Sequence, residues 1–415
     1  MIATGRRRVV VTGMGTVNPL GKTLDDFWTG LIEGRSTART IDHFDTSRVT
    51  TKFASLVPDF DPQEYLERKL VSRNGRVTHL AVASATLALA DSGLNLDQVD
   101  RRRVGVELGT GIGAFLEFYE GSAGFAAGGR VSSFFAPMII PNMAAGQIAI
   151  NLGLTGPNST TCTACAASTQ AIGNAARVVE RGDADVILAC GSEGDTGIMG
   201  LAGFGAVRAL STRNQDPATA SRPFDAERDG FVIGEGSATL VLESLEHALK
   251  RDARIHGEVI GFARTDDAFH AVAPHESGEA ASRCITLALA DAGIEAQEID
   301  YVNAHGTSTG LNDAAETKAL KMALGDHAYK IPISSTKSMI GHLLGGAGAV
   351  EAVATLLSMK HGMVHPTINY QTPDPACDLD YVPNVARVHE VRTAISNGFG
   401  FAGQNAVLVL RRFEA

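Results

Sequence analysis

Cys165 and two histidines that follow it are the residues of this chain whose types and surroundings suggest covalent catalysis. Cys165 stands in the run TACAAS over 163–168, His305 in NAHGTSTG and His342 in STKSMIGHLLGGAG. Segments rich in Gly, Ser and Thr let the backbone approach a ligand closely. A thiol together with two imidazoles predicts an enzyme that works through a covalent intermediate formed from a thioester.

A helix is predicted to begin at Cys165 and to activate its thiol. The apolar residues after it share one helical stripe, and Gly182 is placed to end the helix. That stripe consists of Ala171, Ile172, Ala175, Ala176 and Val179. A helix N-terminus carries partial positive charge and unpaired N–H groups, which stabilise a thiolate. The alternative is a small buried thiol, which is the commonest role of a free cysteine.

The second histidine has candidate partners close by in the sequence. Lys337, before His342, and Glu351, after it, would form a buried pair that holds this loop. The alternative for Lys337 is an ordinary surface lysine. Most histidines are structural or face solvent, and that role is expected for three others: His79, His270 and His275.

The cysteine content favours a reducing compartment. The five cysteines are Cys162, Cys165, Cys190, Cys284 and Cys377. An odd number scattered over a long chain argues against a disulfide framework, so we expect a cytoplasmic protein. Cys162 and Cys165 have the spacing of a redox or zinc CxxC motif, but no second CxxC completes four ligands, and no metal site is expected.

The composition excludes several classes of protein. The 415 residues are 44% hydrophobic and carry a formal net charge of −10, which is typical of a globular protein and argues against a general nucleic-acid binder. No run of about 18 apolar residues occurs, so no membrane-spanning helix is expected. The short apolar run after the N-terminal arginines enters a glycine-rich turn at once and does not resemble a signal peptide.

An internal repeat indicates that the chain is duplicated. TLALADSGLNLDQVD at 86–100 matches TLALADAGIEAQEID at 286–300, and each copy predicts a helix ended by glycine, then a strand and a glycine-rich turn. GEGSATLVLESL (234–245) and GQNAVLVLRRF (403–413) each predict a strand that closes its half. We therefore expect one half over 1–255, with the nucleophile, and one over 256–415, with both histidines.

The two halves predict a layered α/β fold. Continuous apolar runs such as VILAC at 186–190 alternate with helical patterns, which favours sheets covered on both faces. The segments that begin at Cys165 and His342 each continue as a helix. A pseudo-twofold axis would then place these two residues at equivalent, facing helix N-termini.

Four ordered motifs carry a family resemblance. Residues 163–165 (TAC), 303–309 (NAHGTST), 335–342 (STKSMIGH) and 398–401 (GFGF) resemble the β-ketoacyl-acyl-carrier-protein synthases. The resemblance is closest to the type II enzymes, which are elongating condensing enzymes of fatty-acid synthesis. It covers nearly the whole chain and includes RALSTRN (208–214) and SRPFDAERDGFVIGEG (221–236).

The resemblance implies a thiolase-like αβαβα fold of two βαβαβαββ halves, a homodimer, and a decarboxylative Claisen condensation that needs no cofactor. Cys165 would take the acyl group, with the N–H groups of Cys165 and Phe401 as the oxyanion hole. His305 and His342 would stabilise the enolate formed when malonyl-acyl carrier protein loses carbon dioxide. Lys337, supported by Glu351, would set their environment. The 3-oxoacyl product, two carbons longer, would remain on the phosphopantetheine that arrives on the carrier protein.

The resemblance also implies which residues contact the substrate. They are Ile112 and Phe204 along the acyl tunnel, Phe399 and the gate residue Phe401, and Thr307 and Thr309 on the pantetheine arm. The chain departs from the family pattern at Val272, in place of a residue that binds the arm, and in the gate loop at Ala402 and Gln404. The GTGIG run at 109–113 has no acidic ribose partner and does not predict a nucleotide site.

Basic residues are expected to receive the acidic carrier protein. Arg68, Lys69, Arg73 and Arg76 form a local basic cluster, and Arg208 matches a family docking position. We assign Lys69, Arg73 and Arg208 to the docking surface. The alternative is an ordinary solvated helical face.

Three other functions share parts of this pattern. A CoA-dependent thiolase would condense without decarboxylation and normally has a second catalytic cysteine, which 391–415 lacks. A type II polyketide ketosynthase would use the same Cys-His-His set. A chain-length or scaffold partner would keep the fold without the chemistry, and the presence of Cys165 argues against it.

Overall fold

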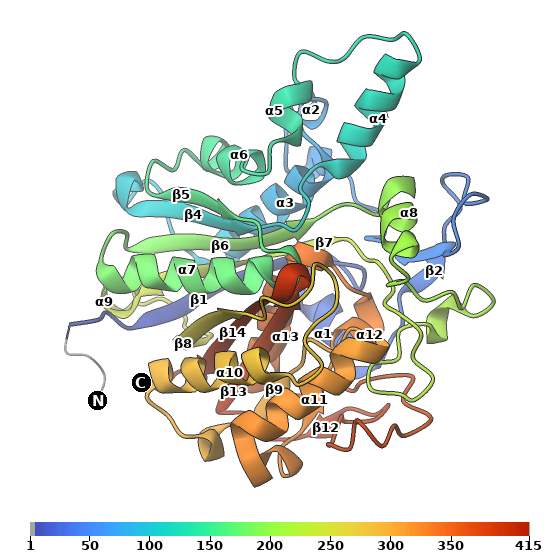
Figure 1. Ribbon diagram of the computed structural model, residues 1–415. Coiled ribbons are helices and arrows are strands. Elements are labelled where there is room, and N and C mark those ends of the chain that lie inside the picture. Colours follow the sequence, from blue (N-terminus) through green and yellow to red (C-terminus); the bar gives the residue numbers. More distant parts are fainter. Residues whose placement is uncertain (1–4, 415) are drawn as a thin grey trace.

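The computed structural model describes residues 5–414 and shows two halves joined through one ten-stranded sheet (Figure 1). The strand order is β10-β9-β13-β14-β8-β1-β7-β6-β4-β5. The strands of the first half are β1 (Val9–Val17), β4 (Val104–Gly109), β5 (Asn158–Thr161), β6 (Val186–Glu193) and β7 (Gly236–Ser244). Those of the second half are β8 (Gly257–Asp266), β9 (Tyr301–Asn303), β10 (Ile333–Ser334), β13 (Thr393–Gly400) and β14 (Gln404–Arg411).

Both halves have the same topology. In the first, β1 and β6 run antiparallel to β7, and β4 runs parallel to β6 and β5. In the second, β8 and β13 run antiparallel to β14, and β9 runs parallel to β13 and β10. The half-sheets meet where β1 and β8 pair through Val10 and Val11. The predicted duplication is therefore confirmed.

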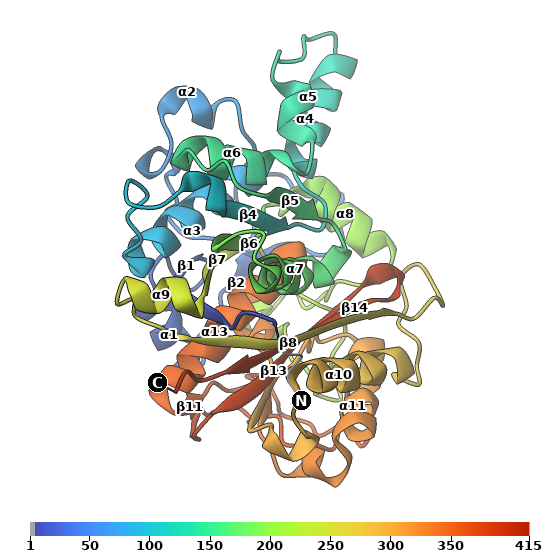
Figure 2. The ribbon, with the colours of Figure 1, turned by 90° about the vertical axis from the view of Figure 1, so that its left-hand side faces the viewer.

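Helices cover both half-sheets and fill the space between them (Figure 2). The outer layer of the first half contains α3 (Arg76–Ser92) and α6 (Met143–Leu152), and that of the second contains α10 (Glu279–Ala292) with α11 (Gly310–Leu324) beside it. The central layer is α7 (Ala167–Arg181) and α13 (Ala347–His361), which contact each other and strands of both halves. The layers follow the predicted αβαβα order.

The remaining helices and strands lie around these layers. They are α1 (Leu24–Ile32), α2 (Arg68–Val71), α4 (Phe115–Ala126), α5 (Phe135–Ile139), α8 (Ile198–Ala206), α9 (Leu245–Lys250) and α12 (Lys337–Ile340), and the strand pairs β2 (Ala38–Thr40) with β3 (Phe53–Ser55) and β11 (Met363–Val364) with β12 (Arg387–Val388). Among residues 5–414, no helix has the length and apolar character needed to cross a membrane.

The repeated sequence forms the same structure in each half. α3 ends at Gly93 and α10 at Gly293, with left-handed φ angles of 62° and 68°. Asp91 and Asp291, near these helix ends, each accept a hydrogen bond from a backbone N–H of the first strand of their own half, at 2.9 and 3.0 Å. Each helix is thereby fastened to its sheet by the same side chain.

Glycines allow these helices to lie directly on the strands. A Cβ added to Gly13 would stand 2.4 Å from Ala88 O, and one added to Gly261 would stand 2.5 Å from Ala288 O. Both approaches are too close for any side chain. The expected boundary between 255 and 256 falls in the segment that joins α9 to β8, and it stays a prediction.

An arm made of α4, α5 and the chain between them projects from the body of the first half (Figure 1). Large apolar side chains on it or directly after it are open to solvent: Phe125 is 65% exposed and Phe118 44%, and Ile140, which follows α5, is 49% exposed. Such a concentration of exposed apolar side chains is typical of an interaction surface.

Candidate active site

Cys165 lies in a tight turn between a strand and a helix. β5 ends at Thr161, a 3-10 turn spans Ala164–Ala166, and α7 begins at Ala167. Ala164 has a φ of 47°, a left-handed conformation that costs energy for any residue with a Cβ. This strained turn presents the thiol at the start of a buried helix, as the sequence predicted.

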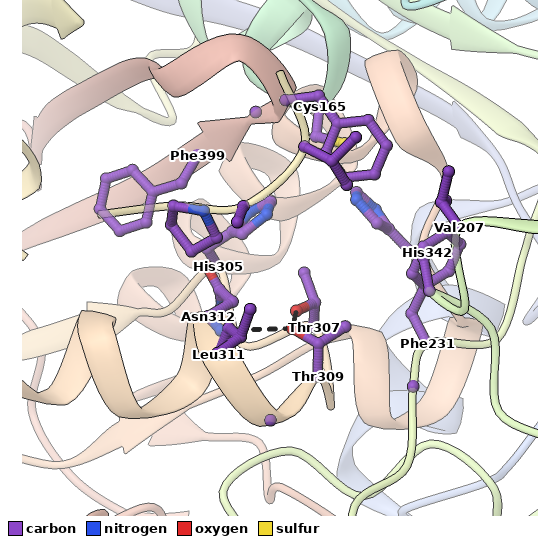
Figure 3. Close-up of a pocket in the computed structure, with 18 of the residues that line it drawn as sticks. Cys165, Val207, Phe231, His305, Thr307, Thr309, Leu311, Asn312, His342 and Phe399 are labelled. Carbon is purple, nitrogen blue, oxygen red and sulfur yellow. Dashed lines mark hydrogen bonds between the residues drawn. The ribbon is translucent and has the colours of Figure 1, made fainter. Parts of the chain in front are cut away.

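The thiol opens into a cavity of about 480 Å³. Nine residues identified from the sequence are on its wall: Cys165, Phe204, Arg208, His305, Thr307, Thr309, His342, Phe399 and Phe401. Figure 3 shows Cys165 on one side of the cavity, with the imidazoles of His305 and His342 facing it. The two halves therefore contribute to one site.

A buried ion pair fixes the tautomer of His305. Lys337 and Glu351 are about 1% exposed and form a salt bridge, and Lys337 Nζ lies 3.4 Å from His305 Nδ1. Because an ammonium group can only donate, Nδ1 must accept, and the ring proton resides on Nε2. Burial raises the pKa of Glu351, and Lys337 acts in the opposite direction.

His342 is held by its backbone and by aromatic packing. Its N–H donates to Val232 O at 2.7 Å, and its carbonyl accepts from Gly234 N at 2.9 Å. The ring packs edge-on against Phe231 and His305, with centroids 5.2 and 5.3 Å apart. Neither ring nitrogen has a hydrogen-bond partner among residues 5–414, so both are available to a ligand.

Both histidines are neutral at physiological pH. Burial lowers the pKa of His305 and of His342 well below 6.5, and the positive charge of Lys337 acts in the same direction. A neutral imidazole can donate one hydrogen bond to a substrate oxygen without carrying charge into the cavity.

The thiol of Cys165 is not poised as a thiolate, contrary to the expectation from its helix position. Burial raises its pKa to about 12, and Glu193 acts in the same direction. Lys337 and the N–H groups of Phe401 and Cys165 lower it by less. These two N–H groups act on the sulfur from the backbone beside it.

The pseudo-twofold axis relates different residues from those expected. Leu344 matches Ala164: each begins a 3-10 turn, with φ of 46° and 47°, directly before the central helix of its half. Cys165 therefore corresponds to Gly345, and His342 corresponds to Cys162. The prediction that Cys165 and His342 occupy equivalent places was wrong by three positions, because the histidine belongs to the segment before the turn.

Buried carboxyl groups hold the His305 loop, and sequence reasoning missed them. Glu316 accepts the backbone N–H groups of His305 and Gly306, each at 2.8 Å. Asp313 accepts those of Thr307 and Ser308 at 3.1 and 3.2 Å. The available signal was two acids three residues apart in LNDAAETKAL, directly after GTSTG.

The gate segment carries backbone strain in this structure. Ala402 has a φ of 60°, and its N–H donates to Ala271 O at 2.9 Å. Gln404 donates to Asp266, whose carboxylate oxygen lies 2.5 Å away. The Phe401 ring lies 6.1 Å from Phe204. The backbone of Ala402 is thus tied to the loop that contains Val272, which also lines the cavity, and the side chain of Gln404 is tied to the last residue of β8.

The other predicted residues lie away from the cavity wall. Ile112 packs in the same apolar cluster as Phe204 and Phe231. The exposed Lys69 pairs with Glu67 at 2.8 Å. Arg73 lies 4.4 Å from the centre of the Phe134 ring on the arm.

Arg76 does not belong to an exposed basic cluster. Its guanidinium forms a two-point ion pair with the buried Glu235, at 2.7 and 3.1 Å. The sequence could not reveal this partner, which lies far along the chain.

Comparison with known proteins gives matches along the whole chain. Residues 6–248 match the model of the beta-ketoacyl synthase N-terminal domain, and residues 256–371 match that of the C-terminal domain. The 3-oxoacyl-[acyl-carrier-protein] synthase 2 of Synechocystis sp. is 49% identical over 411 residues, which cover 99% of each chain.

Solved structures agree with these matches. A beta-ketoacyl synthase from Burkholderia phymatum is 39% identical with a TM-score of 0.92, over 98% of this chain and 100% of that one. A type II polyketide ketosynthase, solved in complex with its acyl-carrier protein, is 36% identical with a TM-score of 0.91, over 99% and 100%.

Proposed function

The chain belongs to the β-ketoacyl synthase family, and from that premise we propose that it is a 3-oxoacyl-[acyl-carrier-protein] synthase that elongates fatty acids. One observation carries the proposal: Cys165, His305 and His342 face one another across a single cavity. The cysteine supplies a site for the acyl group, and the two neutral imidazoles supply donors for an enolate.

In the first step Cys165 accepts the acyl group. Its sulfur attacks the thioester carbonyl, the bond to the carrier's sulfur breaks, and the thiol proton ends on the departing sulfur. The N–H groups of Cys165 and Phe401 would bind the oxyanion that forms on the carbonyl oxygen. Because burial holds the thiol protonated, attack must be coupled to removal of that proton rather than rely on a preformed thiolate.

In the second step the histidines support carbon–carbon bond formation. Loss of carbon dioxide from a malonyl thioester leaves an electron pair on the α-carbon and the carbonyl oxygen. The Nε2–H of His305, which Lys337 fixes, and an N–H of His342 donate to that oxygen. The α-carbon then attacks the acyl carbonyl, the bond to Cys165 breaks, and the released sulfur takes up a proton from water. Lys337 and Glu351 act through His305 as positioning residues.

The substrates arrive on acyl carrier protein, and the enzyme itself needs no cofactor or metal. Thr307 and Thr309, whose hydroxyls lie 2.9 Å apart on the cavity wall, would bind the phosphopantetheine arm. Arg208, which is exposed and lines the cavity, would bind the acidic carrier protein. Lys69 on α2 and Arg73, two residues after α2, would add positive charge to the same docking surface.

The protein functions as a homodimer. The projecting arm with Phe118 and Phe125, together with Ile140 directly after it, offers an apolar surface for a second copy. β5, at one end of the sheet, has a free edge among residues 5–414 and could pair with its counterpart. Light scattering should give twice the mass of one chain for wild type, and Phe125→Asp should lower the measured mass toward that of a single chain.

Fatty-acid elongation is favoured over polyketide synthesis by the degree of similarity. The identity is 49% to a 3-oxoacyl-[acyl-carrier-protein] synthase 2 and 36% to a type II polyketide ketosynthase. A thiolase would need a second cysteine near 391–415, where none occurs. Five free cysteines suit a cytoplasmic location.

Intact-protein mass spectrometry tests the covalent step. Wild type and Cys165→Ala are mixed with a panel of acyl-carrier proteins and acyl-CoAs. Wild type alone should gain the acyl mass, and fastest from the carrier protein. Absence of an adduct with every donor would rule out the proposed chemistry, and a preference for acyl-CoA would move the assignment toward a CoA-dependent enzyme.

A further inference from the structure

Glu193, the last residue of β6, binds two turns that come from opposite halves of the chain. Its Oε1 accepts a hydrogen bond from Thr110 Oγ1 at 3.1 Å. Its Oε2 accepts from Gly111 N at 2.6 Å and from Gly345 N at 3.1 Å. The residue is completely buried, so these three donors are its hydrogen-bond environment.

The two turns touch where Glu193 binds them. A Cβ added to Gly345 would stand 2.0 Å from Gly111 N, and a Cβ added to Gly111 would stand 2.8 Å from Glu193 Oε2. Two backbone N–H groups that point at one buried oxygen depend on that oxygen to accept from both. Glu193 therefore joins two turns that are in direct contact across the boundary between the halves.

Each turn lies next to a reacting group. His342 precedes Gly345 in the loop that enters α13. Gly111 lies beside the residue before Cys165, since a Cβ added to it would stand 3.5 Å from Ala164 O. A change in the spacing of Gly111 and Gly345 would consequently move the imidazole of His342 relative to the thiol.

We propose that Glu193 is a positioning residue for the condensation: by accepting both N–H groups as a carboxylate, it sets the spacing between the His342 loop and the Cys165 turn. The assignment rests on the proposed function of the cavity. Glu193 touches no substrate and acts through these two turns.

The charge state of Glu193 decides how many of these hydrogen bonds it can accept. Burial raises its pKa to about 7; Asp195 acts in the same direction, and the N–H groups of Gly111 and Gly345 oppose it. The other titratable groups that its charge acts on are Cys162 and Cys165. A carboxylate can accept from all three donors, whereas a protonated or amidated side chain loses part of that capacity.

The experiment compares Glu193→Gln and Glu193→Asp with a matched control, Glu243→Gln. Glu243 is also buried and charged, but it lies on the neighbouring strand β7 at the opposite end of the β6–β7 pair, where it binds Arg251 and His247. Two rates are measured for each variant: acylation of Cys165 by acyl-carrier protein, and release of carbon dioxide from malonyl-carrier protein by the preformed acyl-enzyme. Melting temperatures are recorded in parallel.

We expect Glu193→Gln to slow carbon dioxide release at least about tenfold, because a small displacement of a reacting group has effects of that order. Acylation should change by less than about threefold, since α7 supports Cys165 independently. Glu193→Asp, which keeps a carboxylate, should retain more decarboxylation than the glutamine variant. Glu243→Gln should lower the melting temperature without separating the two rates.

Two results would overturn the assignment. In the first, Glu193→Gln releases carbon dioxide at the wild-type rate. In the second, acylation and carbon dioxide release fall by the same factor and the melting temperature falls with them, as for a variant that is only less stable, such as Glu243→Gln. Failure of the proposed function would look different, because wild type itself would then release no carbon dioxide from malonyl-carrier protein.

Discussion

Replacement of Lys337 by methionine should separate the stability of the buried ion pair from its role in catalysis. Lys337 and Glu351 are both about 1% exposed. Removal of one member leaves the other buried without a partner, which typically costs about 3–5 kcal/mol. The unfolding entropy of 415 residues, at about 2.1 cal/mol/K each, is about 0.9 kcal/mol/K. The melting temperature of Lys337→Met should therefore fall by about 3–6 °C.

The double variant Lys337→Met/Glu351→Leu removes both charges while it keeps similar volumes. Such replacements are often neutral or stabilising, so most of the lost melting temperature should return. Turnover should not return, because His305 Nδ1 still lacks the donor that fixes its tautomer.

Differential scanning calorimetry and a continuous assay of carrier-linked product, run at one protein concentration, measure the two effects. A wild-type melting temperature for Lys337→Met would show that the pair contributes nothing to stability. Recovery of turnover in the double variant would refute the role assigned to Lys337.

Three further predictions concern the gate, the His305 loop and carrier docking. Ala402→Gly should stabilise the protein by about 1 kcal/mol in denaturant titrations, because glycine relieves the left-handed φ of 60°; an unchanged midpoint would show that the loop stores no strain. Burial raises the pKa of Glu316 from 4.5 to about 7. Wild type should therefore lose up to about 3 kcal/mol of stability relative to Glu316→Gln as the pH rises from 4.5 to 7. Its turnover should fall as the pH drops through 7, when the carboxylate that holds His305 protonates; a flat difference in stability between the two proteins would contradict the raised pKa. Arg208→Glu should raise KM for acyl-carrier protein several-fold at low salt and less at high salt, while KM for an acyl-pantetheine stays unchanged. Lys69→Glu/Arg73→Glu should act in the same way, and unaltered kinetics at low salt would remove these residues from the docking surface.

The duplication could be predicted from the sequence because it rests on local patterns. The repeated TLALAD segment specifies a helix, the glycine that ends it and the aspartate that fastens it to its own half, and all of these recur in the structure. The strands β7 and β14, which close the two halves, could be predicted equally well, since their β-branched runs are bounded by glycine. Helix periodicity likewise placed the buried stripe of α7.

The electrostatics of the site could not be predicted in the same way. The helix position of Cys165 suggested an acidic thiol, but its pKa depends mainly on burial, which only the tertiary structure specifies. Glu193 and Glu316 were missed for a related reason: their partners are backbone N–H groups, which no side-chain motif records. Arg76 looked exposed in the sequence because Glu235, its partner, is distant along the chain.

The most direct test of the account is the mass of the carrier protein after one turnover. Acylated wild-type enzyme is mixed with malonyl-carrier protein in a single-turnover experiment, beside Cys165→Ala, His305→Ala and His342→Ala. We expect wild type alone to produce a 3-oxoacyl-carrier protein two carbons longer than the bound acyl group, together with free enzyme and carbon dioxide. Formation of that product by either histidine variant at the wild-type rate, or its absence with wild type, would contradict the claim that these three residues form one condensing site.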